Sequence, residues 1–335
     1  MTAVHELDGP AAWTGDEMRE RSDWTIELQP RHVTELTAAL AAVDRPGVEL
    51  ADIGKSDFPL PTLAPVLGDM VDELMDGRGF ALVRGVPVES LTEHQAELMA
   101  WGIGLHVGIP LQQGAGAKLL MHVRDQGVDP KSPLARGYQH RAFLDYHTDT
   151  PDVVALLCVR PAMEGGVSTI VSSVAVHDEI VRARPDLAAV LYEPWWHDRR
   201  RGDGPDSFFQ CPIYAVNEGG TKLFAYYGPD YIRSAPRGAH VPGLTPRQTE
   251  AMEFLERLNN EPRFVLDMHF QPGDVQFLNN YVVMHGRTEY VDFPDPALKR
   301  DLIRLWLTVD RDLGLPASIS ERGLMSRSAA FRRPA

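Results

Sequence analysis

The sequence contains little cysteine: Cys158 and Cys211 are the only two in 335 residues. A disulfide framework is therefore excluded, and so few thiols are typical of a protein from a reducing cytosol. Cys158 stands in the apolar run 153–159, which favours a buried and inert thiol. The start of the chain has no basic segment followed by an apolar stretch, so we predict no signal peptide. No apolar run reaches the roughly 18 residues of a membrane span, and we expect a cytoplasmic protein.

Positive charge is scarce as well. The chain has 33 Lys and Arg against 47 Asp and Glu, a formal net charge of −14. General binding of nucleic-acid phosphates requires clustered Lys and Arg, so we expect no nucleic-acid partner, and an anionic membrane surface is disfavoured for the same reason. A small-molecule substrate fits this balance better. The composition leaves a homo-oligomer open.

The sequence does contain many short apolar segments separated by turn residues. Helices are expected at 31–43, 63–76 and 245–259, and a capping box at Ser90-Leu91-Thr92-Glu93 predicts another helix towards Trp101. The expected strands cover 80–86, 119–124, 153–159, 167–173, 213–216, 223–227, 264–268, 275–278 and 299–307. Many short strands with few helices favour an antiparallel β-sandwich or barrel with helices outside. We expect an N-terminal helical extension (1–78), one catalytic domain (79–312) and a tail (313–335).

The segment Asp145-Tyr146-His147-Thr148-Asp149 carries the first chemical signal. Residues two apart on a strand point to one face, so His147 and Asp149 could bind one metal ion. A second imidazole from a distant strand, His285, would complete the two-His, one-carboxylate triad of a non-haem Fe(II) site with three open positions. Alone the pair is weak evidence, because the chain has 12 histidines. A zinc-dependent hydrolase or isomerase could use the same ligands.

The strand predicted at 299–307 places Arg300 and Arg304 on one face. Two such arginines would repel each other without anions, and a dicarboxylate could accept a bidentate hydrogen bond from Arg300. The alternative is that both arginines pair with internal Asp or Glu. Three further polar or aromatic side chains, Gln112, Tyr138 and Tyr146, are candidates for a substrate pocket, and the alternative for the loop residues is ordinary surface exposure.

Taken together, the motifs resemble those of a known family. In chain order they are His147-x-Asp149, Gly165-Gly166-x-Ser168, His285, and the pair Arg300 and Arg304. This ordered set resembles the Fe(II)/2-oxoglutarate dioxygenases of the taurine dioxygenase type, which include clavaminate synthase-like enzymes. The resemblance covers roughly 80–310, with Gly79-Phe80 and Val83-Arg84-Gly85 as its early marker. It implies a double-stranded β-helix (jelly-roll) core, mainly β with surrounding helices.

The resemblance also implies roles for single residues. His147, Asp149 and His285 would hold the iron, and Arg300 would bind the distal carboxylate of 2-oxoglutarate. A hydroxyl after the Gly-Gly pair would assist, and Ser168 and Thr169 are the two candidates, because neighbours on a strand face opposite ways. Arg304 would meet an acidic group of the substrate.

The implied reaction uses Fe(II), 2-oxoglutarate and O2 and releases succinate and CO2. It would oxidise an unactivated C–H bond of a small molecule such as an amino acid or secondary metabolite. Hydroxylation is favoured, with desaturation or another oxidation as an alternative outcome. Because Asp149 retains the carboxylate ligand, halogenation is disfavoured. A non-catalytic β-barrel that binds 2-oxoglutarate is the alternative from a different class.

Overall fold

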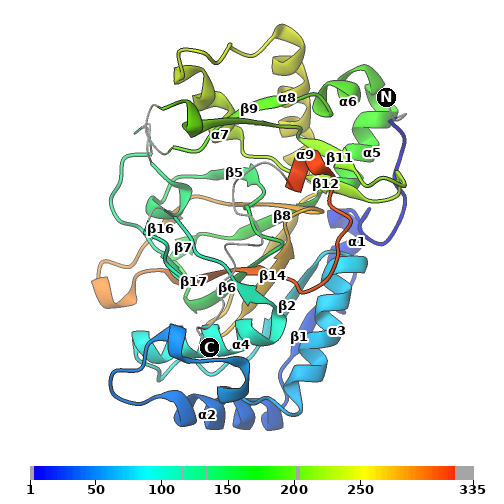
Figure 1. Ribbon diagram of the computed structural model, residues 1–335. Coiled ribbons are helices and arrows are strands. Elements are labelled where there is room, and N and C mark those ends of the chain that lie inside the picture. The colour runs from blue at the N-terminus through cyan, green and yellow to red at the C-terminus, as the bar shows by residue number, and fades with distance from the viewer. Residues whose placement is uncertain (1–3, 115, 131, 133–134, 201–203, 321–335) are drawn as a thin grey trace.

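The computed structural model describes residues 4–114, 116–130, 132, 135–200 and 204–320. Figure 1 shows strands in the middle of the molecule, the helices α2 to α4 along its lower and right sides, and α5 to α8 with β9 at the top. The part of the predicted tail at 321–335 lies outside the described residues.

The larger sheet has seven strands, some of which line the cavity described in the next subsection. Its order is β1-β2-β14-β6-β17-β3, and β4 also pairs with β17. Its strands are β1 (Thr25–Glu27), β2 (Phe80–Arg84), β3 (Ile109–Pro110), β4 (Met121–Val123), β6 (Val153–Arg160), β14 (Val275–Asn279) and β17 (Asp301–Thr308). Pairing is antiparallel except between β1 and β2. The N-terminal segment therefore adds a parallel strand to the core sheet, besides its helices.

The second sheet has the order β13-β8-β15-β5. Its strands are β13 (Leu266–Met268), β8 (Ser168–Ser172), β15 (Val283–Arg287) and β5 (Leu144–His147). Three antiparallel pairs complete the strands: β7 (Glu164–Gly165) with β16 (Tyr290–Val291), β9 (Trp195–Asp198) with β10 (Phe208–Cys211), and β11 (Tyr214–Val216) with β12 (Leu223–Ala225). The expected jelly-roll core with surrounding helices is confirmed, whereas the β9–β10 hairpin was not predicted.

Most of the long helices follow their sequence signals. The helices are α1 (Gly15–Arg19), α2 (Pro30–Val43), α3 (Leu63–Asp76), α4 (Glu93–Val107), α5 (Ser173–Ala183), α6 (Pro185–Leu191), α7 (Pro229–Ser234), α8 (Pro246–Asn259) and α9 (Ala317–Ser320). The helices predicted at 31–43, 63–76 and 245–259 are confirmed. At the start of α8, the Thr245 hydroxyl accepts a hydrogen bond from the Gln248 backbone N–H at 3.2 Å, as a capping box requires. No helix in the described part of the chain combines the length and apolar character that a bilayer crossing needs.

The start of α4 differs from the prediction. The cap is Thr92, whose hydroxyl accepts from the Gln95 N–H at 3.2 Å, so the helix begins two residues later than a cap at Ser90 implies. Glu93 follows Ser90 by three positions, and Gln95 follows Thr92 by three positions. Both serine and threonine therefore fit the capping-box pattern, which alone does not identify the cap. The helix also continues through Gly102 and Gly104. A Cβ on Gly104 would lie 2.7 Å from Leu305, so this glycine lets α4 pack closely on β17.

One continuous buried apolar cluster runs from Leu7 near the N-terminus to Ile319 in α9. It includes Leu36 of α2 and Leu67 of α3, both fully buried, together with the apolar face of β17. The N-terminal segment therefore packs as part of the same core as the jelly roll. This packing supports one face of β17, whose other face carries Arg304.

Candidate active site

Strand pairing places the two predicted histidine ligands side by side. His147 is the last residue of β5, and His285 lies in the middle of β15. The antiparallel register sets these two residues directly opposite each other, and their ring centroids are 4.3 Å apart. Residues opposite each other in an antiparallel pair share one face of the sheet. The positions of both imidazoles thus follow from backbone pairing.

The carboxylate is positioned differently from the prediction. Asp149 lies two residues beyond the end of β5, so strand alternation does not aim its side chain. Hydrogen bonds in the loop do so: its backbone N–H donates to Asn280 Oδ1 at 3.0 Å, and Trp306 Nε1 donates to its Oδ2 at 3.1 Å. As a result, Asp149 Oδ2 lies 3.9 Å from His285 Nε2. One ligand atom each of His147, Asp149 and His285 lies within 4.8 Å of the others.

Protonation states also suit a divalent cation. Burial alone would raise the pKa of Asp149, but the charges of Arg304, His285 and His147 lower it, so the carboxylate is ionised. Burial, with a contribution from His147, lowers the pKa of His285 to about 3, so its imidazole is neutral. His147 Nδ1 lies 2.8 Å from the Asp145 carbonyl oxygen, so it donates there and leaves Nε2 with a lone pair. Two imidazoles and one carboxylate match the donor set of a non-haem Fe(II) site.

Arg300 stands at one end of the cavity, next to the Gly165-Gly166 turn. It is 3% exposed; its backbone N–H donates to Asp292 at 2.8 Å, and its Nη1 donates to the Val123 carbonyl at 3.3 Å. Gly166 has a φ of +65°, and a Cβ there would lie 3.1 Å from Arg300 Nε. Glycine at this position therefore leaves room for the guanidinium.

Arg287 is a cavity residue that sequence reasoning missed. It is 4% exposed, and its Nη2 donates to the carbonyl of His140 at 2.9 Å. The guanidinium carbons of Arg287 and Arg300 lie 4.8 and 5.1 Å from the centroid of the Tyr290 ring. Burial, together with the charge of Arg300, lowers the pKa of Arg287 to about 10. The signal was present in the sequence, because Arg287 follows His285 by two residues and so shares its strand face.

Neither buried arginine forms a direct ion pair within the described part of the chain, although the Asp292 carboxylate accepts a hydrogen bond from the Arg300 backbone. Among the described residues, no carboxylate oxygen comes within 4.0 Å of the guanidinium of Arg300 or Arg287. The alternative in which both predicted arginines pair with internal acids therefore does not describe Arg300. It applies in part to Arg304, whose Nη1 lies 3.5 Å from Asp149 Oδ2.

Of the two candidate hydroxyls, Ser168 lines the cavity. Its Oγ accepts a hydrogen bond from Gln276 Nε2 at 3.0 Å. Thr169 follows on the opposite face of β8, where its Oγ1 would be 3.2 Å from a Cβ built on Gly286. The structure therefore places Ser168, and not Thr169, on the wall that Arg300 shares.

Two residues that were predicted to line the substrate pocket, Tyr146 and Gln112, do not border the cavity. Tyr146 precedes His147 on β5, so its side chain points to the other face of the strand and packs in the core, 4% exposed, where burial raises its pKa to about 12. Gln112 is exposed, and its neighbour Gln113 is the buried residue. Gln113 Oε1 accepts from Arg304 Nε at 3.0 Å. In this loop Gln113 points inward and Gln112 outward, and neither of them lines the cavity.

Tyr138 does line the cavity, and the Arg304 guanidinium carbon lies 5.5 Å from its ring centroid. Further lining residues are Arg199 and Arg200 after β9, Phe209 of β10, and Tyr231 of α7. Trp195 is fully buried, residues 199 and 200 line the cavity, and residue 201 lies outside the described chain.

One cavity, open to solvent, is bordered by His147, Asp149 and His285 and by the arginines Arg287, Arg300 and Arg304. Further arginine and aromatic side chains complete its lining. A jelly roll with a two-His, one-carboxylate set beside a buried arginine defines the class of Fe(II)- and 2-oxoglutarate-dependent oxygenases.

Comparison with known proteins agrees with this class. Residues 44–306 match the family model described as "Taurine catabolism dioxygenase TauD, TfdA family", so the chain belongs to this family. It is 27% identical over 332 residues to FR-33289 synthase of Streptomyces rubellomurinus, covering 97% of this chain and 96% of that protein. The chain is a 2-oxoglutarate-dependent dioxygenase that uses Fe(II) and O2. The alternatives of a zinc hydrolase and of a non-catalytic barrel are not favoured.

Solved structures show the same fold. An asparagine oxygenase superposes with a TM-score of 0.64 at 17% identity, covering 85% of this chain and 93% of that one. The non-heme iron oxygenase OrfP superposes with a TM-score of 0.65 at 16% identity, covering 85% and 94%. At these identities the likeness establishes the fold, and the substrate has to be argued from the cavity.

Proposed function

We propose that this dioxygenase hydroxylates an unactivated C–H bond of a small molecule, with His147, Asp149 and His285 as the protein ligands of Fe(II). The observation that carries the proposal is the shared cavity: three ligand atoms within 4.8 Å of one another and a buried arginine border the same space. When bound, the iron supplies the chemistry that couples O2 and the oxidative decarboxylation of 2-oxoglutarate to oxidation of the substrate. The protein supplies placement and a shielded site.

Arg300 is assigned to the distal carboxylate of 2-oxoglutarate, with Ser168 beside it. Arg287 shares this task in our proposal, because its guanidinium faces the same Tyr290 ring. Two neighbouring cations without a direct ion pair are disfavoured in a buried site, and a dicarboxylate would relieve their repulsion. The Arg300 backbone N–H donates to Asp292 and its Nη1 donates to the Val123 carbonyl, so both ends of this residue are held.

Arg304 links the iron side of the cavity to the substrate side. Its Nη1 lies 3.5 Å from Asp149 Oδ2, Gln113 holds its Nε, and its guanidinium carbon lies 4.9 Å from the Trp306 ring centroid. These contacts place a fixed positive charge next to a metal ligand. We assign Arg304 to a polar group of the substrate near the oxidised carbon, with Tyr138 forming the adjacent wall.

The substrate class follows from the cavity and from related structures. The asparagine oxygenase structure contains 3-hydroxyasparagine with succinate, and the OrfP structure contains (3S)-hydroxy-L-Arg. Both are small polar molecules with charged groups. The cavity of this chain is likewise lined by charged and aromatic side chains, so a free amino acid or a small charged secondary metabolite is the proposed substrate.

An anaerobic titration tests the proposal. Fe(II) and 2-oxoglutarate are added to the purified protein, and the visible metal-to-ligand charge-transfer absorption of a chelated keto acid is followed. The band should appear with wild type and disappear with His285→Ala, while His269→Ala, an exposed histidine outside the cavity, should behave as wild type. Admission of O2 should then yield succinate. A protein that binds Fe(II) and 2-oxoglutarate yet never forms the band would contradict the proposed ligand set.

A further inference from the structure

The loop that carries Asp149 connects the two large sheets of the jelly roll. It covers residues 148–152, between the end of β5 in the second sheet and the start of β6 in the larger sheet. The turn at 280–282 makes the reverse passage, from β14 of the larger sheet to β15, which contains His285. Both segments cross between the same two sheets. Contacts between the loop and the turn can therefore set the position of Asp149 relative to His285.

Asn280 of the turn binds the loop at three places. Its side-chain Oδ1 accepts from the Asp149 N–H at 3.0 Å, and its Nδ2 donates to the Pro151 carbonyl at 3.1 Å. Its backbone N–H donates to the Asp152 carbonyl at 3.0 Å. Asn280 is buried, so water competes little for these hydrogen bonds. One residue of the turn thus holds three residues of the loop.

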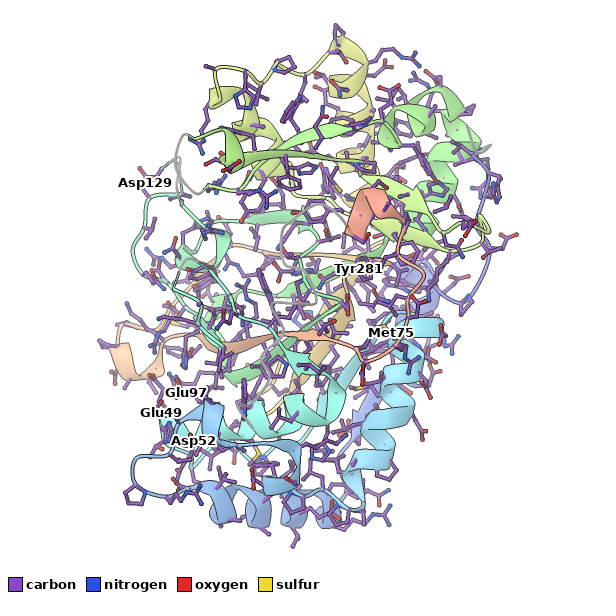
Figure 2. All side chains as sticks on the ribbon, viewed as in Figure 1. Glu49, Asp52, Met75, Glu97, Asp129 and Tyr281 are labelled. Atoms are coloured by element: carbon purple, nitrogen blue, oxygen red, sulfur yellow. The ribbon has the colours of Figure 1, made fainter. Side chains whose placement is uncertain are left out.

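The next residue of the turn adds a fourth hydrogen bond. Tyr281, which is labelled in Figure 2, donates from its hydroxyl to Asp152 Oδ1 at 2.7 Å. The other oxygen of this carboxylate accepts from the Thr308 hydroxyl and, at 3.0 Å, from the Val309 N–H, at the end of β17. The last residue of the loop is therefore held by the turn and by the larger sheet together.

Thr148 holds the start of the loop, between the two predicted ligands His147 and Asp149. Its N–H donates to the Tyr227 carbonyl at 2.7 Å, and its hydroxyl accepts from the Tyr227 N–H at 2.9 Å. The hydroxyl takes the place of a backbone carbonyl in this strand-like pair of hydrogen bonds. Tyr227 is itself buried and donates from its ring hydroxyl to Glu256 of α8 at 2.9 Å.

The backbone of Asp149 needs such contacts because it lies beyond the end of β5. A metal site binds its ion more tightly when the ligands are already in place. The two histidine ligands obtain this from strand register. The hydrogen bond from Trp306 orients the Asp149 carboxylate, but it acts on the side chain alone. Asn280 and Thr148 supply the corresponding constraint on the backbone.

We propose that Asn280 and Thr148 are positioning residues for the metal ligand Asp149. They hold the chain before and after this residue, so that its carboxylate stays at the distance from His285 that a divalent cation requires. The inference rests on the proposed function, in which Asp149 is a ligand of Fe(II). Both residues act through Asp149 and not by contact with the ion. Loss of either side chain should leave the fold in place and weaken metal binding, because the carboxylate would then occupy several positions.

Binding of Mn(II) measures this effect without turnover. Mn(II) is added to the metal-free protein in the absence of 2-oxoglutarate, and the EPR signal of the free ion gives the Kd. Mn(II) takes the same imidazole and carboxylate donors as Fe(II), and His285→Ala gives the background from other binding. Asn280→Ala should raise the Kd by about 10- to 100-fold, the usual cost of losing a group that orients a metal ligand.

Thr148 allows a comparison at nearly constant shape. Thr148→Val keeps the branched side chain and removes the hydroxyl, so the Tyr227 N–H loses its acceptor and the Kd for Mn(II) should rise about tenfold. Thr148→Ser keeps the hydroxyl and should bind Mn(II) within about threefold of wild type. This pair of variants also decides the question if Asn280→Ala does not fold.

Asn279, the last residue of β14, is the matched control for Asn280. It is buried as well, and its side chain makes two hydrogen bonds, from Nδ2 to the Leu74 carbonyl and from the Tyr281 N–H to Oδ1, both at 2.9 Å. Neither partner belongs to the loop of Asp149. Asn279→Ala should therefore lower the urea midpoint much as Asn280→Ala does, yet bind Mn(II) within about threefold of wild type.

The outcomes separate the positioning role from the proposed function. The charge-transfer band with Fe(II) and 2-oxoglutarate is recorded first for wild type. If the band forms but Asn280→Ala and Thr148→Val bind Mn(II) as wild type does, the positioning role is overturned and the iron site stands. The same holds if Asn279→Ala weakens binding as much as Asn280→Ala. If wild type forms no band, the proposed ligand set fails, and the inference fails with it.

Discussion

The two ends of the cavity are built by different means. At the iron end, His147 and His285 lie on β5 and β15, and their opposed positions follow directly from strand register. Asp149 follows β5, and hydrogen bonds outside the sheet hold it. In the part of the cavity lined by Arg199 and Arg200, these two residues follow a short hairpin strand and are held by aromatic rings and one strained residue. Sheet pairing thus fixes the two imidazoles, whereas side-chain contacts hold the two arginines.

This difference predicts how well each part of the cavity tolerates substitution. Sheet register cannot shift by one residue without moving every side chain to the other face, so the iron end tolerates little variation. Loop and hairpin positions accept changes in side chain without disturbing the sheet. Substitutions at the iron end should therefore reduce the reaction far more than substitutions around Arg199.

Removing one iron ligand should have the largest effect. His285→Ala deletes the imidazole opposite His147, and we expect succinate formation to fall by roughly a thousand-fold or more, because the iron loses a protein ligand and its defined geometry. Succinate is measured with saturating Fe(II) and 2-oxoglutarate. The matched control is His269→Ala, whose side chain is exposed. Activity of His285→Ala within tenfold of wild type would rule out this residue as a ligand.

The arginines around Tyr290 should affect 2-oxoglutarate more than they affect the iron. Arg300→Met removes a buried charged donor, and the KM for 2-oxoglutarate should rise by about 100-fold. Arg287→Met, which leaves Arg300 in place, should raise it by about tenfold. Arg247→Met on the exposed side of α8 serves as the control. If Arg287→Met left both the KM and the charge-transfer titration unchanged, its proposed part in binding the distal carboxylate would be withdrawn.

The turn beside Arg300 should be sensitive to a single methyl group. Gly165 has a φ of +68°, and a Cβ there would lie 2.1 Å from the Glu289 carbonyl oxygen. Gly165→Ala should therefore lower the free energy of unfolding by about 2–4 kcal/mol, from the strained φ and the displaced β16. Gly243→Ala, where a Cβ meets nothing within 4 Å and φ is not positive, is the matched control. Equal urea midpoints for the two variants would contradict the packing argument.

Much of the iron end could be predicted from sequence, because its signals are local and periodic. The apolar run of β6, the alternation of β17 and the Gly165-Gly166 turn each restrict a short segment by themselves. The order of the motifs along the chain then brought His147 and His285 together, as the resemblance implied. Even here Asp149 was placed on a strand, since no local pattern marks the end of β5 at His147.

The part of the cavity around Arg199 could not be predicted in the same way. Arg199 and Arg200 line the cavity through the β9–β10 pairing and a positive φ at Arg200, whose N–H donates to Asp198; Asp198 is held in turn by Arg237, far along the chain. The burial of Gln113 and the exposure of Gln112 were unpredictable for a related reason: a loop has no period that says which neighbour is buried. Arg287 is the exception, because its spacing from His285 already placed it on the ligand face.

The smallest expected effect comes from an ion-pair network behind the iron end. His122 of β4 lies 2.8 Å from Asp301 of β17 and 3.2 Å from Glu97 of α4, which is labelled in Figure 2. Arg124 and Arg160 also approach Asp301, at 3.8 and 3.3 Å. Burial alone would lower the pKa of His122, but its hydrogen bonds to the two carboxylates raise it to about 9. The protonated imidazole thus ties β4 to the strand that begins next to Arg300.

The sign of the pH dependence follows from that raised pKa. The unfolded chain releases the proton from His122 near pH 6.5, and the folded chain holds it until about pH 9, so the stabilisation is complete below pH 6.5 and is lost as the pH rises towards 9. His122→Gln should therefore unfold about 2 kcal/mol more easily than wild type at pH 6, and the gap should narrow by pH 9. Urea unfolding of both proteins at several pH values measures this, with the exposed His269→Gln as control. A gap that stays constant from pH 6 to 9 would assign the effect of His122 to packing, because only the ionised imidazole gives a difference that disappears with its charge.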